Sequence, residues 1–93
     1  MSPYIIRYNR LVIERDLRAV DASVWEAVRG AIREKLSHHP EQFGKPLRNV
    51  LRGLRVLRIS DWRVVFRIEK NEVLIGGIRH RREGYKGIET RFL

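Results

Sequence analysis

Three strand-like runs, separated by only two residues each, dominate the second half of the chain. They cover residues 54–59, 62–69 and 72–79, and the pairs Ser60-Asp61 and Lys70-Asn71 separate them. Two polar residues are enough to join antiparallel neighbours in a hairpin, whereas a parallel crossover needs on the order of a dozen residues. The chain is therefore expected to contain an antiparallel meander over residues 54–79.

The N-terminal half predicts one strand and two helices. Residues 4–8 are β-branched and aromatic, as in a strand. Asn9 is expected to cap a helix that runs to about residue 20. Ser23 and Glu26 form a capping box for a second helix to about residue 38, which Pro40 ends. The expected fold is α+β in the order β-α-α-β-β-β, with two helices packed on one face of an antiparallel sheet, in one domain over residues 1–93.

Composition excludes several classes of site. The chain has no cysteine, which excludes disulfides, thiolate zinc sites and a cysteine nucleophile. His38 and His39 are adjacent but have no further ligands nearby in the sequence, so no metal or other cofactor is expected. No apolar run approaches the roughly 18 residues of a membrane span, and the N-terminal residues do not resemble a signal peptide. We expect a cytoplasmic protein without a membrane partner.

Positive charge is concentrated in the second half of the chain. Residues 45–93 hold thirteen Lys or Arg against five Asp or Glu, which accounts for +8 of the formal net charge of +9. Most of these basic residues are arginines, whose planar guanidinium suits phosphate. This distribution predicts a nucleic-acid partner. A solvated basic face, or a surface for an acidic protein, stays the alternative.

The alternation of side chains along the strands predicts where the arginines lie. Leu57, Val64 and Phe66 are expected to face the helices. The opposite face is expected to be open, with Arg58, Arg63, Val65, Arg67, Gly76, Ile78 and His80 on it. With two-residue turns, Arg58 lies opposite Arg63, and Arg63 opposite Ile78. Like charges in such pairs destabilise a sheet, so either a phosphate binds between Arg58 and Arg63 or both splay into water.

Three segments of the sequence resemble the RelE/ParE toxin superfamily. They are FGKPL at 43–47, LRGLRVLRISDWRVVFRI at 51–68, and IRHRREGY at 78–85. The resemblance is stronger to the RelE-type mRNA interferases. It implies a RelE-like fold and a toxin that cleaves mRNA at the ribosomal A site without metal, by attack of the 2′-hydroxyl on the adjacent phosphate.

The resemblance also implies roles for particular residues. Arg63 matches the strand arginine that clamps the scissile phosphate, Arg81 the basic residue that stabilises charge or assists the leaving group, and Tyr85 the terminal tyrosine, a candidate base. His80 is the alternative for proton transfer, because an imidazole ordinarily titrates near neutral pH. The expected RNA-binding residues are Arg58, Arg55, Arg52, Lys45, His80 and Arg82.

The resemblance implies a cognate acidic antitoxin as the first partner, and mRNA and the ribosome as the others. It also leaves room for operator DNA bound through the antitoxin of the complex. Two alternatives to an endoribonuclease stay open. One is the ParE branch, which inhibits DNA gyrase without catalysis; the other is a basic nucleic-acid-binding domain without catalysis.

Overall fold

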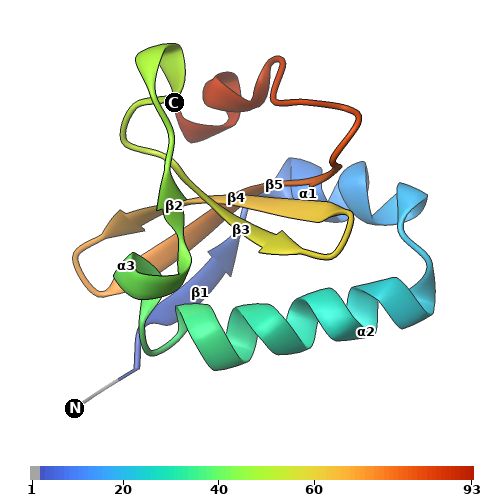
Figure 1. Cartoon of the computed structure of the whole chain (residues 1–93), viewed down its shortest axis with the longest axis horizontal. Coiled ribbons are helices and arrows are strands. Elements are labelled where there is room, and N and C mark those ends of the chain that lie inside the picture. Colours follow the sequence, from blue (N-terminus) through green and yellow to red (C-terminus); the bar gives the residue numbers. More distant parts are fainter. Residues whose placement is uncertain (1–2) are drawn as a thin grey trace.

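The computed structural model describes residues 3–93, which form a five-stranded sheet with a helical layer on one face (Figure 1). The strand order is β1-β5-β4-β3-β2. The two predicted hairpins are confirmed, and their turns place Ser60 and Lys70 in the left-handed region at a φ of 54° each. The strands are β1 (Ile5–Tyr8), β2 (Lys45–Pro46), β3 (Arg55–Ile59), β4 (Trp62–Glu69) and β5 (Glu72–His80).

The sheet is mixed, which corrects the expectation of an antiparallel sheet. β1 pairs with β5 in parallel, with Ile5 opposite Glu72 and Tyr8 opposite Ile75. Parallel pairing is possible because the connection after β1 is long: more than thirty residues of helix and loop precede the next strand. No tight turn therefore forces β1 to run against its neighbour. The α+β class and the helices on one face are as predicted.

The helical layer follows the predicted segments with different ends. Asn9 caps α1 (Arg10–Glu14) by accepting a hydrogen bond from the backbone N–H of Leu11 at 2.8 Å. The chain then continues as a 3-10 turn, η1 (Asp16–Ala19), rather than as one long helix. α2 (Ala22–Ala31) begins after Asp21 without a side-chain cap, and its last turns, η2 (Ile32–Leu36), are π-helical. No helix among residues 3–93 is long and apolar enough to cross a membrane.

Short helical turns lie in the segments before β3 and after β5. α3 (Pro40–Phe43) begins at the proline that was expected to end the second helix. η3 (Asn49–Leu51) precedes β3, and η4 (Ile88–Phe92) lies in the C-terminal segment. Figure 1 shows η4 on the side of the sheet away from α2.

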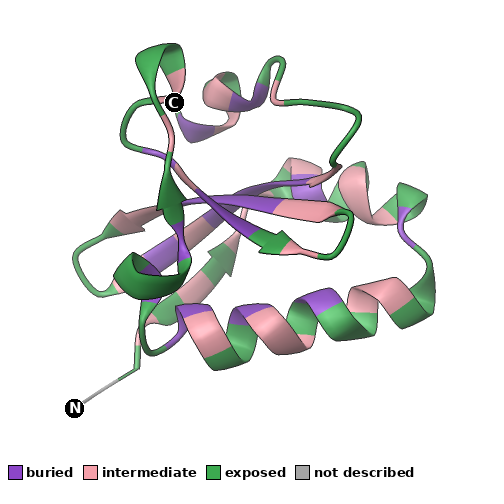
Figure 2. Ribbon diagram, in the orientation of Figure 1, coloured by how far each residue is buried: buried purple, intermediate pink, exposed green. Residues whose placement is uncertain are grey.

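Both faces of the sheet are therefore covered, each by its own apolar cluster (Figure 2). We call the side under α2 the helix face, where Leu57, Val64 and Phe66 are buried as predicted. We call the other side the tail face, because η4 packs there. Its cluster contains Leu54, Val65, Ile88 and Phe92, with Leu47, Leu51, Leu74 and Tyr85 packed against it. The tail face was expected to be open along its length, but the C-terminal segment covers its middle.

A β-bulge in β5 changes the predicted register. Val65 lies opposite Gly77 and Phe66 opposite Ile75, so Gly76 is the extra residue. Beyond the bulge Arg63 pairs with Arg79, not with Ile78 as predicted. Ile78 is consequently buried on the helix face rather than exposed on the tail face.

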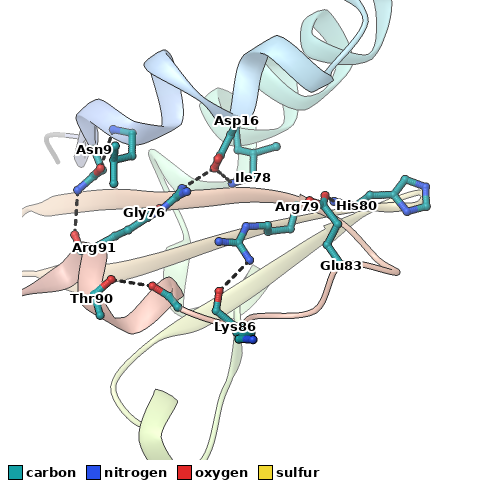
Figure 3. A network of polar contacts seen from close by, with 12 residues as sticks. Asn9, Asp16, Gly76, Ile78, Arg79, His80, Glu83, Lys86, Thr90 and Arg91 are labelled. Carbon is teal, nitrogen blue, oxygen red and sulfur yellow. Dashed lines mark hydrogen bonds and ion pairs between the residues drawn. The ribbon is translucent and has the colours of Figure 1, made fainter.

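The bulged part of β5 extends past the end of β1. Two polar side chains, those of Asp16 and Arg91, form hydrogen bonds with its backbone instead (Figure 3). The Asp16 carboxylate accepts the Ile78 N–H at 2.8 Å and pairs with the Arg91 guanidinium at 2.7 Å. Arg91 also donates to the carbonyl of Gly76 at 3.2 Å, and its own carbonyl accepts from the side chain of Asn9. This network joins the C-terminal segment to the helical layer.

Candidate functional site

Three arginines stand side by side on the tail face at one end of the sheet. Arg58 on β3 lies opposite Arg63 on β4, as predicted, and Arg63 lies opposite Arg79 on β5. We call these three residues the arginine row. Like charges on directly paired positions repel one another, so the row is an attractive position for an anion.

The arginine row has only neutral hydrogen-bond acceptors. Arg63 Nη1 donates to the carbonyls of Ser60 and Trp62, both at 2.9 Å. Arg79 Nη1 donates to the carbonyls of Gly84 and Lys86 in the segment after β5, and Figure 3 shows the bond to Lys86. Among the described residues Arg58 makes no side-chain hydrogen bond or ion pair, and it is exposed. Within the described residues no carboxylate forms an ion pair with any of the three.

Arg67, four residues beyond Arg63 on β4 and on the same face, differs from the row. Its guanidinium pairs with Glu69 at 3.0 Å and donates to the carbonyl of Phe92 at 3.0 Å. It also lies over the Phe92 ring, 5.5 Å from the centroid. Arg67 therefore anchors the C-terminal segment, and the arginines of the tail-face strand positions that form no ion pair among the described residues are those of the arginine row.

Arg81 directly follows β5 and lies at the same end of the sheet, beside the β3–β4 turn. Its backbone N–H donates to the Asp61 carbonyl at 2.7 Å, and its Nε lies 3.6 Å from Asp61 Oδ1. Both side chains are more than half exposed, so solvent screens this pair and it holds Arg81 only weakly. The β3–β4 turn therefore contacts both residues: the Ser60 carbonyl accepts from the Arg63 side chain, and the Asp61 carbonyl accepts from the Arg81 backbone N–H.

Tyr85 lies on the tail face in the segment between β5 and η4. It is half-buried against the cluster formed by Val65, Ile88 and their neighbours. Its carbonyl accepts the Ile88 N–H at 3.0 Å. The bonds from Arg79 end at the carbonyls of Gly84 and Lys86, on either side of it. The structure therefore places Tyr85 on the same face of the sheet as the arginine row.

His80 lies on the opposite face, which corrects its predicted position. It pairs with Trp62, and the two rings are 5.3 Å apart between centroids at 83°. Trp62 packs against the core of the helix face. The bulge at Gly76 causes the change, because one extra residue moves every later side chain of β5 to the other face.

The remaining predicted RNA-binding residues are dispersed. Arg55 lies on the helix-face side, where its Nη1 donates to the carbonyls of Glu41 and Gly44 at 3.3 and 3.0 Å. Lys45 is exposed on β2 opposite Val56. Arg52 and Arg82 are exposed in the segments before β3 and after β5. Arg55 therefore holds the α3–β2 connection. Of these residues, only Lys45 lies on a strand that pairs with the strand of Arg58, because β2 pairs with β3.

Arg79 is the site residue that the sequence did not identify, since the expected register placed Ile78 beside Arg63. The available signal was the pair Gly76-Gly77, because adjacent glycines in a strand are typical of a bulge. As for other ligands, residues 3–93 contain no group of three or more His, Cys, Asp or Glu side chains that could hold a metal ion.

Comparison with known proteins finds a family model and two proteins that are all toxins of toxin-antitoxin systems or named as toxins. Residues 6–85 match the family model described as ParE toxin of type II toxin-antitoxin system, parDE. Toxin RelG of Mycobacterium tuberculosis is 33% identical over 86 residues, which cover 90% of this chain and 98% of that protein. Toxin RelE of the same organism is 38% identical over 55 residues, so the match spans 59% of this chain and 57% of that toxin.

The fold also matches solved structures. The toxin-antitoxin complex RelBE2 from Mycobacterium tuberculosis contains a chain that superposes with a TM-score of 0.79 at 32% identity, covering 87% of this chain and 94% of that one. The Helicobacter pylori protein HP0894 superposes with a TM-score of 0.64 over 85% of this chain and 96% of its own, at 17% identity, which shows a shared fold alone.

Proposed function

Because this chain belongs to the RelE/ParE superfamily, the toxins of type II toxin–antitoxin systems, we propose that it is a metal-independent endoribonuclease. Its substrate is mRNA, cut at the ribosomal A site, and its inhibitor is an acidic antitoxin. Because ribosomes and mRNA are in the cytoplasm, the proposed site of action is the cytoplasm. The arginine row is the observation that carries this proposal.

The row supports phosphate binding for an electrostatic reason. Arg63 and Arg79 donate only to neutral carbonyls, and Arg58 has no side-chain partner among the described residues. These bonds use only Nη1 of Arg63 and Arg79, so a phosphate placed between the three arginines can accept from their other N–H groups, and each such bond joins two opposite charges. It also relieves the repulsion between the paired guanidiniums.

The proposed reaction requires a base, cations and a group that assists departure of the leaving oxygen. The 2′-oxygen attacks the adjacent phosphorus and its proton passes to the base. The bond from phosphorus to the 5′-oxygen breaks, and that oxygen takes up a proton from water. The products are a 2′,3′-cyclic phosphate and a 5′-hydroxyl. In this scheme Arg58 and Arg63 bind the phosphate, Arg81 stabilises the developing charge or assists the leaving oxygen, and Tyr85 accepts the 2′ proton. The position of His80 on the helix face favours Tyr85 over His80 as the base.

The test measures cleavage of mRNA on purified ribosomes, with mapping of the new 5′ ends. Tyr85→Phe keeps the ring and removes the hydroxyl, so we expect a rate loss of about 10²–10⁴ with binding preserved. Arg63→Ala is expected to lower both binding and rate, by roughly ten- to hundredfold, because a charged hydrogen bond is worth about 1.5–3 kcal/mol. Arg10→Ala is the matched control, since Arg10 is exposed on α1 and pairs with Glu14.

Full cleavage by Tyr85→Phe and Arg63→Ala would overturn the assignment of the site. If the unmodified protein cuts no RNA, with or without ribosomes, the endoribonuclease proposal fails. A DNA supercoiling assay then tests the ParE-branch alternative, inhibition of gyrase. The antitoxin partner is supported by the RelBE2 structure, which is a toxin-antitoxin complex, and by the net charge of +9 on this chain.

A further inference from the structure

We propose that Arg79 is a positioning residue that holds Tyr85 beside the arginine row. The inference rests on the proposed function, because it assigns a role in the reaction at the same site. It concerns a residue that the resemblance did not assign and that the predicted register had placed elsewhere.

The contacts of Arg79 join the row to the tyrosine segment. Arg79 Nη1 donates to the carbonyl of Lys86 at 3.2 Å (Figure 3) and to that of Gly84 at 3.3 Å, and these two residues flank Tyr85 in the sequence. In the sheet Arg79 is the direct partner of Arg63. One side chain therefore fixes the distance between the backbone at Tyr85 and the proposed phosphate site.

The segment needs such a restraint because of its glycines. Gly84 and Gly87 have φ values of +70° and +77°, and a Cβ at either position would meet no atom within 4 Å. Glycine populates many backbone conformations, and open space around it adds no restriction. Apart from Arg79, the Tyr85 backbone is tied by the bond from the Ile88 N–H to the Tyr85 carbonyl. Its ring is only half-buried.

The position of the phenol determines the rate because proton transfer depends on distance. A general base acts within about 2.6–3.2 Å of the proton that it accepts. A displacement of about 1 Å can lower the rate roughly a hundredfold. Releasing the Gly84 and Lys86 carbonyls therefore affects the chemical step through Tyr85, while the affinity for RNA depends on the charges of the row.

The first measurement is a double-mutant cycle between positions 79 and 85. Arg79→Met keeps the aliphatic stem and removes the donors, and we expect a fall in single-turnover rate of about 10- to 100-fold. In the Tyr85→Phe background the same substitution is expected to change the rate less than about twofold, because residues that act through one another are not additive. Arg58→Met removes a charge from the same row without touching the segment, so its effect is expected to be equal in both backgrounds. Additive effects of Arg79→Met and Tyr85→Phe would make Arg79 one more phosphate-binding cation and overturn the inference.

The second measurement does not depend on activity. Hydrogen exchange of the Ile88 amide, which donates to the Tyr85 carbonyl, and cleavage after Lys86 by a lysine-specific protease, are expected to accelerate in Arg79→Met and not in Arg58→Met. Arg79→Gln, a polar side chain of shorter reach, is the second variant with the same expectation. Unchanged exchange in both Arg79 variants would overturn the positioning role. If the protein cuts no RNA, the proposed function fails, and the exchange measurement still decides whether Arg79 holds the segment.

Discussion

The buried ion pair between Asp16 and Arg91 offers the sharpest test of how the C-terminal segment is held. Asp16 is in η1 and Arg91 in η4, so the pair joins the helical layer to the segment that covers the tail face. Its side chains are only 6% and 9% exposed. Asp16→Ala removes the carboxylate and leaves a guanidinium with little access to water.

The magnitude follows from the two bonds that Asp16 Oδ2 accepts. One is from Arg91 Nη1 at 2.7 Å and the other from the Ile78 N–H at 2.8 Å. Removing one partner of a buried pair costs about 3–5 kcal/mol, because the other charge stays buried without compensation. A domain of this size has a free energy of unfolding of roughly 5–14 kcal/mol. The melting temperature is therefore expected to fall by about 12–40 °C.

Urea unfolding followed by Trp fluorescence measures this loss, with an exposed pair as control. Arg7 and Glu72 lie 3.5 Å apart with side chains 63% and 36% exposed, so Glu72→Gln is expected to cost less than about 1 kcal/mol. Replacing both partners, Asp16→Ala with Arg91→Met, is expected to recover part of the loss, because no unpaired charge remains. A loss below about 1 kcal/mol in Asp16→Ala alone would refute the argument that burial makes this pair structurally necessary.

Two further changes test the site and the bulge. Asp61→Asn removes the carboxylate beside Arg81, and the affinity for RNA is expected to rise about two- to fivefold, as loss of an exposed pair implies; unchanged affinity in a filter-binding titration would show that Arg81 is not restrained by Asp61. Gly76→Ala places a Cβ against the ring of Phe92, and the free energy of unfolding is expected to fall by about 1–3 kcal/mol. Chemical denaturation that shows no loss would mean that the C-terminal segment adjusts freely.

The local features of the meander were predictable because short turns fix strand pairing. With only Ser60 and Asp61 between two strands, Arg58 has to lie opposite Arg63, and it does. The alternation from Leu57 to Phe66 follows from the same register. Asn9 was likewise predictable as a cap, because its side chain serves a backbone N–H only two residues away.

Features that depend on distant segments were not predictable. The parallel pairing of β1 with β5 joins residues more than sixty positions apart in the sequence. No short turn connects these two strands, so the local sequence does not indicate that they pair. The bulge at Gly76 accommodates Phe92, and Gly77 accommodates Ile88, because a Cβ at either glycine would overlap those side chains. The C-terminal segment thus packs directly on the bulge, and the shifted register beyond the bulge places Arg79 beside Arg63 and His80 beside Trp62.

The arginine row is preorganised by its own surroundings. Arg63 is held by carbonyls of the β3–β4 turn, and Arg79 by carbonyls beside Tyr85. Ordering a flexible arginine on binding costs about 0.5–1.5 kcal/mol for each side chain, and here the folded chain has already ordered two of them. The carbonyls that hold these side chains use only Nη1 of each, so phosphate binding adds bonds between opposite charges without first breaking an ion pair of Arg63 or Arg79. The same two arginines connect the anion site to the turn that carries Asp61 and to the segment that carries Tyr85, so binding and proton transfer share one framework.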